Sequence, residues 1–247
     1  MLSVILGVVQ AQTYSYFYQG LDWDGQCVTS ATQSPVDLNN VQLRDQSNSN
    51  LQPLGISYSK AAAKLVSDSV SYRLLGAFGS LVTVDYRAAA REVAFHTPSE
   101  HLVNGEAADL EMQIYHEVQG SDGVAALAVL FVEGSYNAAL GTLINSPAEV
   151  DLSLLFSGAK LVRNYYAYKG SLTVPNCESV VAWYVVATQM TASKDQLDYF
   201  RNKWENNINF AGGNGNNRLP QSLNNREVAY FQSNGAGLLL LSLYLSF

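Results

Sequence analysis

Short apolar segments alternate with turn-forming residues through most of this chain. Six segments are rich in β-branched and aromatic residues and are bounded by Gly, Pro, Asn or Ser, which is typical of β-strands. No internal repeat is visible, and strand segments outnumber helical ones, so the pattern predicts a single β-dominated domain. The predicted strands are Ser80–Arg87, Arg91–His96, Leu110–Val118, Val124–Gly134, Lys160–Tyr168 and Ser179–Met190.

Two segments have the residues that start helices, and we predict helices over Ser146–Phe156 and Ser193–Trp204. Each segment begins with a serine that is followed three residues later by Glu149 or Gln196. This spacing is that of a capping box, in which two side chains satisfy N–H groups of the first turn. The first segment also has Pro147 at its first helical position.

Both ends of the chain differ from the middle. Residues 1–11 form an apolar run of signal-peptide length followed by small residues, and a buried N-terminal strand is the alternative. Residues 233–247 place small residues before an apolar tail, as in a lipid-anchor signal, and a terminal strand or a plain tail is the alternative. We therefore predict a secreted or outer-surface protein with its domain at 12–232 and membrane attachment, if any, through a C-terminal lipid anchor.

Charge and cysteine content narrow the function classes. The formal net charge is −7, and Lys and Arg are not clustered. Phosphate binding requires such clusters, so nucleic acid is excluded as a partner. The two cysteines, Cys27 and Cys177, have no CxxC neighbour and, in a secreted chain, most simply form one disulfide.

All three histidines lie within one short stretch, which raises the question of a metal site. A three-ligand zinc site on adjacent strands requires two histidines on alternate residues of one strand and a third on its neighbour. Those places are occupied by Ala94, His96 and Gln113. His101 lies in a predicted turn and His116 points to the opposite face, so both are interpreted as core histidines.

Three motifs occur in a specific order: QSPVDL (Gln33–Leu38), FHTPSEH (Phe95–His101) and GSLTVP (Gly170–Pro175). With them, the chain resembles the α-class carbonic anhydrases over nearly all of Tyr14–Phe231. The resemblance implies a mainly β, α-carbonic-anhydrase fold: a central, mostly antiparallel sheet of about ten strands, a few short peripheral helices and a conical pocket that leads to zinc. It also implies that Cys27 pairs with Cys177, as in extracellular members.

The positions of the three zinc ligands depart from the family pattern. In active members three histidines bind the metal, which activates a water molecule. Ala94 supplies no donor and Gln113 only a neutral amide oxygen, which leaves His96. We therefore predict no zinc or other cofactor, and a pseudoenzyme similar to the catalytically inactive carbonic-anhydrase-related proteins. Glu111, which orients the third histidine in active members, is predicted to bond to the Gln113 amide.

Other family positions are retained in part. Glu100 and Thr173 match the carboxylate and hydroxyl that orient zinc-bound hydroxide, and are interpreted as vestigial. Tyr115 and Val174 depart from the residues usual in the pocket wall, and the proton-shuttle histidine is absent. The predicted wall consists of Tyr115, Leu172, Val174 and Trp183.

Three hypotheses follow. The first is a catalytically silent protein that serves as an extracellular binding or structural component, with protein partners engaged by some of its 15 tyrosines. The alternative is residual carbon dioxide hydration with a weak or altered metal site that uses His96, Gln113 and Glu111. The third is a module that binds a small ligand on the wall from Thr173 to Trp183.

Overall fold

The computed structural model describes residues 14–39, 42–43, 52–67, 70–204 and 215–232. The predicted signal peptide at 1–11 and the predicted anchor tail at 233–247 lie outside these residues. None of the helices in the described ranges combines the length and the apolar character needed to cross a bilayer.

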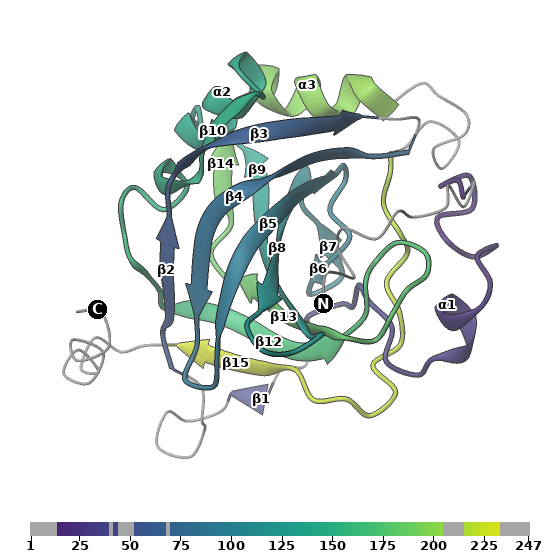
Figure 1. Ribbon diagram of the computed structural model, residues 1–247. Helices are drawn as coiled ribbons and strands as arrows, with labels where there is room; N and C mark the ends of the chain where they lie inside the picture. Colours follow the sequence, from purple (N-terminus) through teal and green to yellow (C-terminus); the bar gives the residue numbers. More distant parts are fainter. Residues whose placement is uncertain (1–13, 40–41, 44–51, 68–69, 205–214, 233–247) are drawn as a thin grey trace.

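A large curved sheet dominates the described part of the chain (Figure 1). Three short helices and one 3₁₀ turn accompany it. The helices are α1 (Gln26–Thr29), α2 (Ala138–Asn145) and α3 (Lys194–Trp204), and the turn is η1 (Leu152–Leu154). The strands are β1 (Gln42–Leu43), β2 (Leu54–Tyr58), β3 (Lys60–Ser67), β4 (Tyr72–Val82), β5 (Arg87–His96), β6 (Leu102–Val103), β7 (Glu106–Ala107), β8 (Leu110–Val118), β9 (Val124–Glu133), β10 (Glu149–Asp151), β11 (Leu161–Val162), β12 (Asn164–Gly170), β13 (Val181–Val186), β14 (Met190–Ala192) and β15 (Ala229–Gln232).

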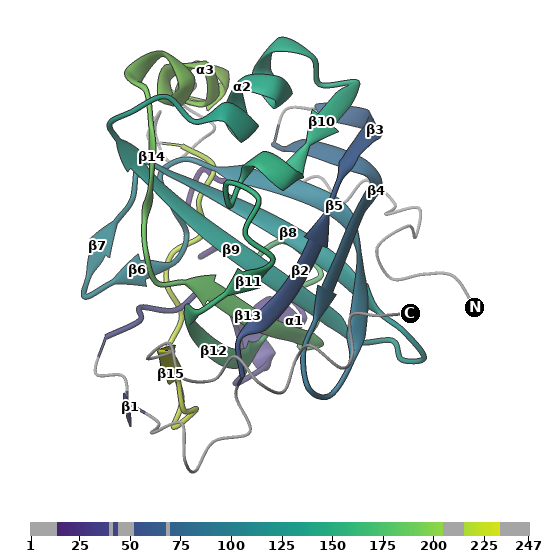
Figure 2. The same ribbon diagram turned by 90° about the vertical axis from the view of Figure 1, so that its left-hand side faces the viewer.

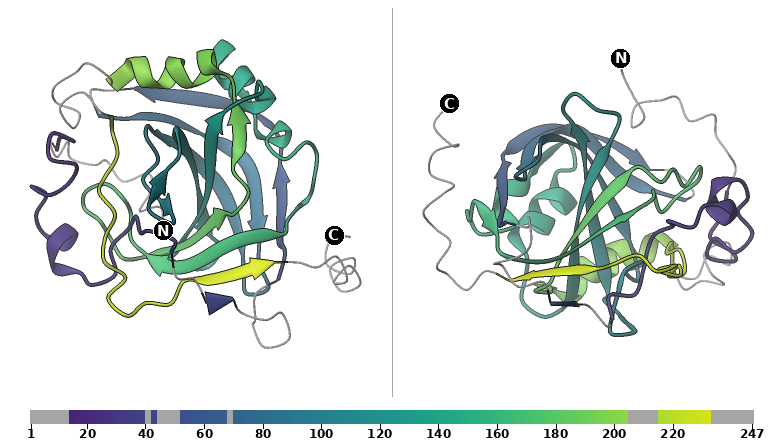
Figure 3. Two further views of the ribbon diagram at one scale, coloured as in Figure 1. Left: turned by 180° about the vertical axis from the view of Figure 1, so that it is seen from behind. Right: turned by 90° about the horizontal axis from the view of Figure 1, so that it is seen from below.

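The sheet confirms the predicted fold class. Within the described residues it has 13 strands, and its main path runs β1-β15-β12-β13-β9-β8-β5-β4-β2-β11. Most neighbours are antiparallel, while β13 and β14 join β9, and β1 joins β15, in parallel. Strands β12 and β15 run together along one margin (Figure 3). Strands β4, β5, β8 and β9, which are neighbours in the sheet, form the antiparallel centre on which the site is built.

The helix prediction is confirmed for one segment and wrong for the other. In α3, Gln196 Oε1 accepts from the Ser193 N–H at 3.2 Å, and Ser193 Oγ accepts from the Gln196 N–H at 3.4 Å, which is the predicted capping box. Ser146–Phe156 is not an α-helix: Glu149–Asp151 is extended, because β10 pairs with β3 and buries Val150, and the 3₁₀ turn η1 follows. The neighbouring helix α2 ends just before Ser146.

The unpredicted helix α2 begins at an asparagine cap. The Asn137 side chain accepts hydrogen bonds from the N–H groups of Ala139 and Leu140. Its apolar side chains, Leu140 and Leu143, are fully buried. Figure 2 shows α2 beside α3 at one end of the sheet.

Strand predictions were most accurate at the centre of the sheet. Strand β8 has the predicted bounds, and β9 ends one residue earlier than expected. The predicted strand Ser80–Arg87 is wrong, because it crosses the turn between β4 and β5, where the Thr83 side chain accepts from the N–H groups of Asp85 and Tyr86. Alternating polar and apolar residues therefore continued past the real end of a strand.

The core has two parts, one on each face of the sheet. Met112, Ile114, Leu140 and Phe200 belong to the larger apolar cluster, which lies between the sheet and the helices. The second cluster lies on the opposite face and contains Ala94, Tyr115 and Trp183. The candidate site lies on this second face.

Candidate functional site

The register of β5 and β8 brings the predicted ligand positions together. Ala94 is directly opposite Gln113, and His96 is opposite Glu111. Directly opposed residues share a face, so all four side chains lie on one side of the sheet. The predicted alternation in β8 is confirmed by the hydrogen bonds described below, which join Glu111, Gln113 and Tyr115.

Glu111 is the most heavily bonded carboxylate of the site, and it is fully buried. Its Oε2 accepts from the backbone N–H groups of Glu100 at 2.9 Å and His101 at 2.8 Å. Its Oε1 bonds to His101 Nδ1 at 2.7 Å and Gln113 Nε2 at 2.8 Å. Burial raises the pKa of Glu111, but the charge of His101 and these hydrogen bonds outweigh burial and hold the pKa at about 2.

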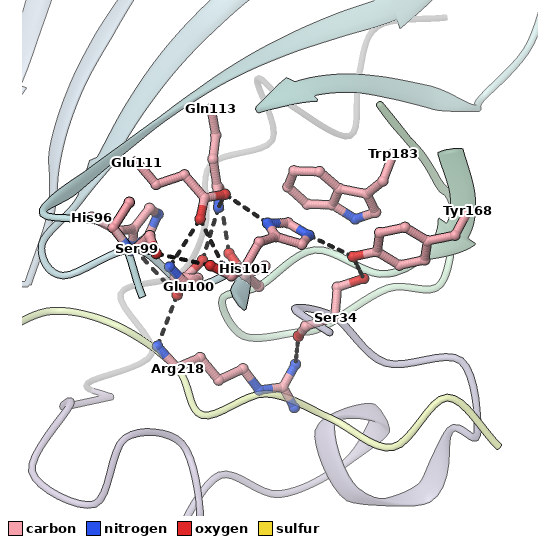
Figure 4. A network of polar contacts seen from close by, with 12 residues as sticks. Ser34, His96, Ser99, Glu100, His101, Glu111, Gln113, Tyr168, Trp183 and Arg218 are labelled. Carbon is pink, nitrogen blue, oxygen red and sulfur yellow. Dashed lines mark hydrogen bonds and ion pairs between the residues drawn. The ribbon is translucent and has the colours of Figure 1, made fainter. Parts of the chain in front are cut away.

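The Gln113 amide bridges two buried carboxylates (Figure 4). Its Nε2 donates to Glu100 Oε2 at 2.9 Å and to Glu111 Oε1 at 2.8 Å. Its Oε1 accepts from the Tyr115 hydroxyl at 2.6 Å and from Thr173 Oγ1 at 3.5 Å. Two donors and two acceptor positions are the full capacity of a side-chain amide. The predicted bond between Glu111 and Gln113 is therefore present, within a larger network.

Glu100 is the second buried carboxylate. Its Oε1 accepts from the Arg218 backbone N–H at 2.9 Å and lies 3.3 Å from His96 Nδ1. Burial raises the pKa of Glu100, and the attraction of His96 opposes that rise. The Thr173 hydroxyl, also fully buried, lowers the pKa of Glu100 as well. The two carboxylates therefore differ in proton affinity although both are inaccessible to solvent.

His101 links this cluster to a second set of hydroxyl groups (Figure 4). Its Nε2 is 2.6 Å from the Tyr168 hydroxyl, which donates to Ser34 Oγ at 3.0 Å. The Tyr168 proton is directed to Ser34, so His101 Nε2 donates to the Tyr168 oxygen. Sequence reasoning missed Tyr168 and Arg218 as members of the network. Both residues lie in stretches that match the family, but no role was assigned to them, and Ser34 was likewise noted only as part of the QSPVDL motif.

His116 lies apart from this network, on the other face of β8. Its Nδ1 bonds to the Ala125 carbonyl oxygen and its Nε2 to the Tyr58 hydroxyl, both at 3.0 Å. Both ring nitrogens therefore have partners in the apolar core.

Of the predicted wall residues, Tyr115 and Trp183 lie beside the amide. Trp183 contacts the Tyr115 ring at a centroid distance of 5.8 Å and the His101 ring at 4.7 Å. Leu172 is half-buried against the same cluster. Val174 is half-buried in the loop that follows β12. A cavity of about 510 Å³ opens elsewhere, and none of the wall residues lines it; its lining includes Thr97, Pro98, Asp109, Lys194 and Arg201.

The disulfide prediction is confirmed. Cys27 of α1 is bonded to Cys177, with their Cα atoms 5.0 Å apart. The bond fastens the loop that carries Thr173 to the N-terminal segment. Gln33 Nε2 reinforces this connection by donating to the Cys177 carbonyl oxygen at 3.0 Å.

The residues at the ligand positions do not fit a zinc ion held by three histidines. Ala94 has no donor atom, and both acceptor positions of the Gln113 oxygen are already bonded. His96 alone supplies an imidazole. Across the described ranges, no group of three His, Cys, Asp or Glu side chains is placed to hold a metal ion. The absence of zinc from the protein stays a prediction.

The chain is similar in sequence to carbonic anhydrases and to dioscorins. A family model described as eukaryotic-type carbonic anhydrase matches residues 19–232. A carbonic anhydrase of Pectobacterium atrosepticum is 26% identical over 214 residues, which cover 83% of this chain and 82% of that protein. Dioscorin dioA3 of Dioscorea japonica is 31% identical over 225 residues, which cover 85% and 79%.

Solved structures of proteins from the same two groups have the same fold. Dioscorin complexed with ascorbate superposes with a TM-score of 0.73 at 30% identity, covering 85% of this chain and 90% of that one. The α-carbonic anhydrase of Thermovibrio ammonificans in complex with sulfanilamide gives 0.69 at 28% identity, covering 83% and 89%. The fold and the site are those of an α-carbonic-anhydrase-like protein. The chain belongs to the carbonic anhydrase family.

The prediction that the chain is not an enzyme is contradicted by these comparisons. Relatives from Pectobacterium and Nostoc that span more than four-fifths of this chain are carbonic anhydrases, and so are solved structures with the same fold. The prediction inferred loss of activity from the two missing ligand histidines, the altered wall residues Tyr115 and Val174, and the absent proton-shuttle histidine. These departures do not by themselves show a pseudoenzyme, and Glu100, Glu111 and Thr173 are still joined through Gln113 in a buried hydrogen-bond network.

Proposed function

We propose that this protein catalyses the reversible hydration of carbon dioxide at a low rate, with an altered site. The observation that carries the proposal is the family match over residues 19–232, together with relatives named as carbonic anhydrases that cover most of the chain. Conversion of carbon dioxide and water into bicarbonate releases a proton, so the site needs a base that accepts it.

His96 is the residue we assign to that role. Its Nδ1 lies 2.8 Å from the Asn216 carbonyl oxygen, which can only accept, so Nδ1 carries a proton. The neutral ring then keeps its lone pair on Nε2, where it can take a proton from water that attacks carbon dioxide. His96 is 4% exposed, whereas Glu100 and Gln113 are fully buried, so His96 is the one of these three side chains with any exposed surface.

The chemistry of a single base also explains why a low rate is expected. A positioned general base typically accelerates a reaction by about 10²–10⁴-fold. The Glu100 carboxylate lies 3.3 Å from His96 Nδ1, where it attracts the positive charge that the ring gains when the proton is transferred. Water attack forms the new C–O bond, the electron pair of a C=O bond moves to oxygen, and the proton moves to Nε2.

Stopped-flow hydration of carbon dioxide, followed with a pH indicator, tests this proposal. We expect the wild-type protein to exceed the buffer rate, and a chelator to leave its rate unchanged. The variant His96→Gln is expected to fall to the buffer rate, while the matched control His116→Gln, on the other face, keeps the wild-type rate. A wild-type rate equal to buffer would overturn the activity, and a rate abolished by chelation would overturn the metal-free base.

A second candidate function is the binding of a small polar molecule at this site. The observation that favours it is the structural similarity to dioscorin, which was solved complexed with ascorbate. Titration calorimetry with ascorbate tests it, with Trp183→Leu as the variant that alters the wall. No heat of binding with the wild-type protein would remove this candidate.

We also propose that the protein is secreted or held at the outer cell surface. The disulfide between Cys27 and Cys177 supports this location, because disulfides persist in oxidising compartments. Signal cleavage near Ala11, the lipid anchor and the protein partners remain predictions. Terminal sequencing of native protein, combined with phospholipase release from membranes, tests the two end segments. An intact N-terminus at Met1 would contradict the signal peptide.

A further inference from the structure

A cationic side chain lies in the same cross-strand row as the candidate site. Arg73 on β4 is directly opposite Ala94 on β5, which is directly opposite Gln113 on β8. Side chains of directly opposed residues project from the same face, so Arg73 stands on the site side of the sheet, one strand beyond Ala94. Arg73 takes no part in the hydrogen-bond network of Glu100, Glu111 and Gln113 described above.

The guanidinium group of Arg73 is only weakly engaged. Its Nη1 is 3.3 Å from Glu92 Oε1 and its Nε is 3.3 Å from Ser71 Oγ, both at the long end of hydrogen-bond distances. An arginine has five N–H groups in a planar fork. The other three donate no hydrogen bond to the described part of the chain. The side chain is 33% exposed, so these groups are accessible from solution.

In this row only Ala94 stands between Arg73 and Gln113, and it contributes a methyl group rather than a longer side chain. Ala94 and Tyr115 are largely buried, each 6% exposed, so Arg73 is the accessible end of the row. With a net charge of −7, the protein as a whole repels anions, so anion binding here would depend on a local cation.

We propose that Arg73 binds a small planar oxyanion, bicarbonate in the first place, over Ala94. Arginine recognises planar carboxylate-type groups through two parallel N–H bonds, a geometry that lysine cannot reproduce. The inference deepens the proposed function and rests on it, because bicarbonate is the product of hydration. Glu92 competes with the anion for the same guanidinium and therefore limits its affinity.

The same sheet offers a matched control for this ion pair. Arg91 and Glu117 form a pair at 3.1 Å with side chains 41% and 37% exposed. That pair has the same chemistry and an arginine of similar accessibility, although its glutamate is more exposed than Glu92, and it includes no residue of the row formed by Arg73, Ala94 and Gln113. Removing Arg91 changes the net charge of the protein by the same amount as removing Arg73.

Calorimetric titration with sodium bicarbonate at constant ionic strength tests the proposal on the full chain. We expect Arg73→Gln to weaken binding by about tenfold or more, as loss of a charge-assisted contact does, and Arg91→Gln to leave it unchanged within about twofold. Glu92→Gln should tighten binding, because it removes the competing carboxylate. The double variant R73Q/E92Q leaves no unpaired carboxylate and should bind as weakly as R73Q.

The outcomes separate this inference from the proposed function. Equal affinities for wild type and R73Q, or no binding of bicarbonate by wild type, would overturn the role of Arg73. If bicarbonate binds through Arg73 but hydration in the same preparation equals the buffer rate, the proposed function fails and the anion site stands. If hydration exceeds the buffer rate while R73Q binds bicarbonate as wild type does, only the inference about Arg73 fails.

Discussion

The two faces of strand β8 are equally buried but chemically opposite. Glu111 and Gln113 on one face and Met112, Ile114 and His116 on the other all have no exposed surface. The first face holds a charged carboxylate with four donors and a fully bonded amide. The second holds an apolar core with one titratable group, His116.

This difference shows two ways in which a fold accommodates buried polar groups. On the site face, many hydrogen bonds keep a carboxylate charged in the absence of water. On the core face, His116 is kept neutral: Nδ1 donates to the Ala125 carbonyl oxygen, and Nε2 accepts from the Tyr58 hydroxyl, both at 3.0 Å. Burial lowers the pKa of His116 to about 4. The two faces should therefore respond differently to mutation and to pH.

The largest effect is expected from removal of the Glu111 carboxylate. Glu111→Ala would leave His101, the Gln113 amide and two backbone N–H groups without their acceptor, at a cost of about 5 kcal/mol in the free energy of unfolding. Urea unfolding measures it. Met112→Ala, the adjacent residue on the core face, should cost about 3 kcal/mol through its cavity alone. A smaller loss in the free energy of unfolding for E111A than for M112A would contradict this prediction.

A metal should be accepted by the site face once two histidines are introduced. In the double variant Ala94→His with Gln113→His, three imidazoles would share one face, and Glu111 Oε1 could accept a ring N–H as it now accepts from the amide. Free zinc at a thousandfold excess over Kd would then add about 4 kcal/mol of stability. Metal analysis and thermal unfolding measure this, with A94H alone as control. A folded double variant without zinc would show that the three positions do not converge.

The core face should respond to pH through His116. Its pKa is about 4 in the folded protein against 6.5 for an unperturbed histidine. The unfolded chain therefore binds the proton first, and stability is complete above pH 6.5 and falls as the pH decreases toward 4. The loss amounts to about 3 kcal/mol. Urea unfolding across this range should show a shallower slope in His116→Gln. An identical slope in both proteins would rule out His116 as its source.

The smallest effect is expected from single hydroxyl groups. Tyr115→Phe removes the donor to Gln113 Oε1, and Tyr58→Phe removes the donor to His116 Nε2. Each loss should cost about 1 kcal/mol, the usual net value of a hydrogen bond. Thermal unfolding of the two variants compares the faces directly. Equal stability of Y115F and wild type would mean that the amide finds another donor.

Sequence reasoning was reliable where structure depends on neighbours along the chain. The alternation of β8 and the bond from Gln113 to Glu111 follow from the two-residue period of a strand. The capping box of α3 is likewise local. Such features are determined within a few residues, so the pattern of a single segment is sufficient to predict them.

Features set by distant partners could not be predicted in this way. Glu149–Asp151 is extended because it pairs with β3. This pairing outweighs the capping-box sequence of Ser146 and Glu149, which favours a helix. Tyr168 and Arg218 reach the site from 57 and 107 residues beyond Glu111. The shift in register between Ala90 and Glu92 is also invisible in the pattern. Nothing in the sequence near these residues indicates which segments will pack against them.

The strand order also has a consequence for how the molecule assembles. Strands β4, β5, β8 and β9 are neighbours in the sheet and are joined by short connections, of which the longest contains only the hairpin β6–β7, whereas β13, which carries Trp183, joins β9 in parallel across a long connection. Closing long loops costs more entropy and slows folding. During synthesis, Glu111 and Gln113 emerge before Tyr168, Trp183 and Arg218 exist. We therefore expect the carboxylates to stay hydrated in a partly formed meander and to lose their water only when the C-terminal third of the chain closes over them.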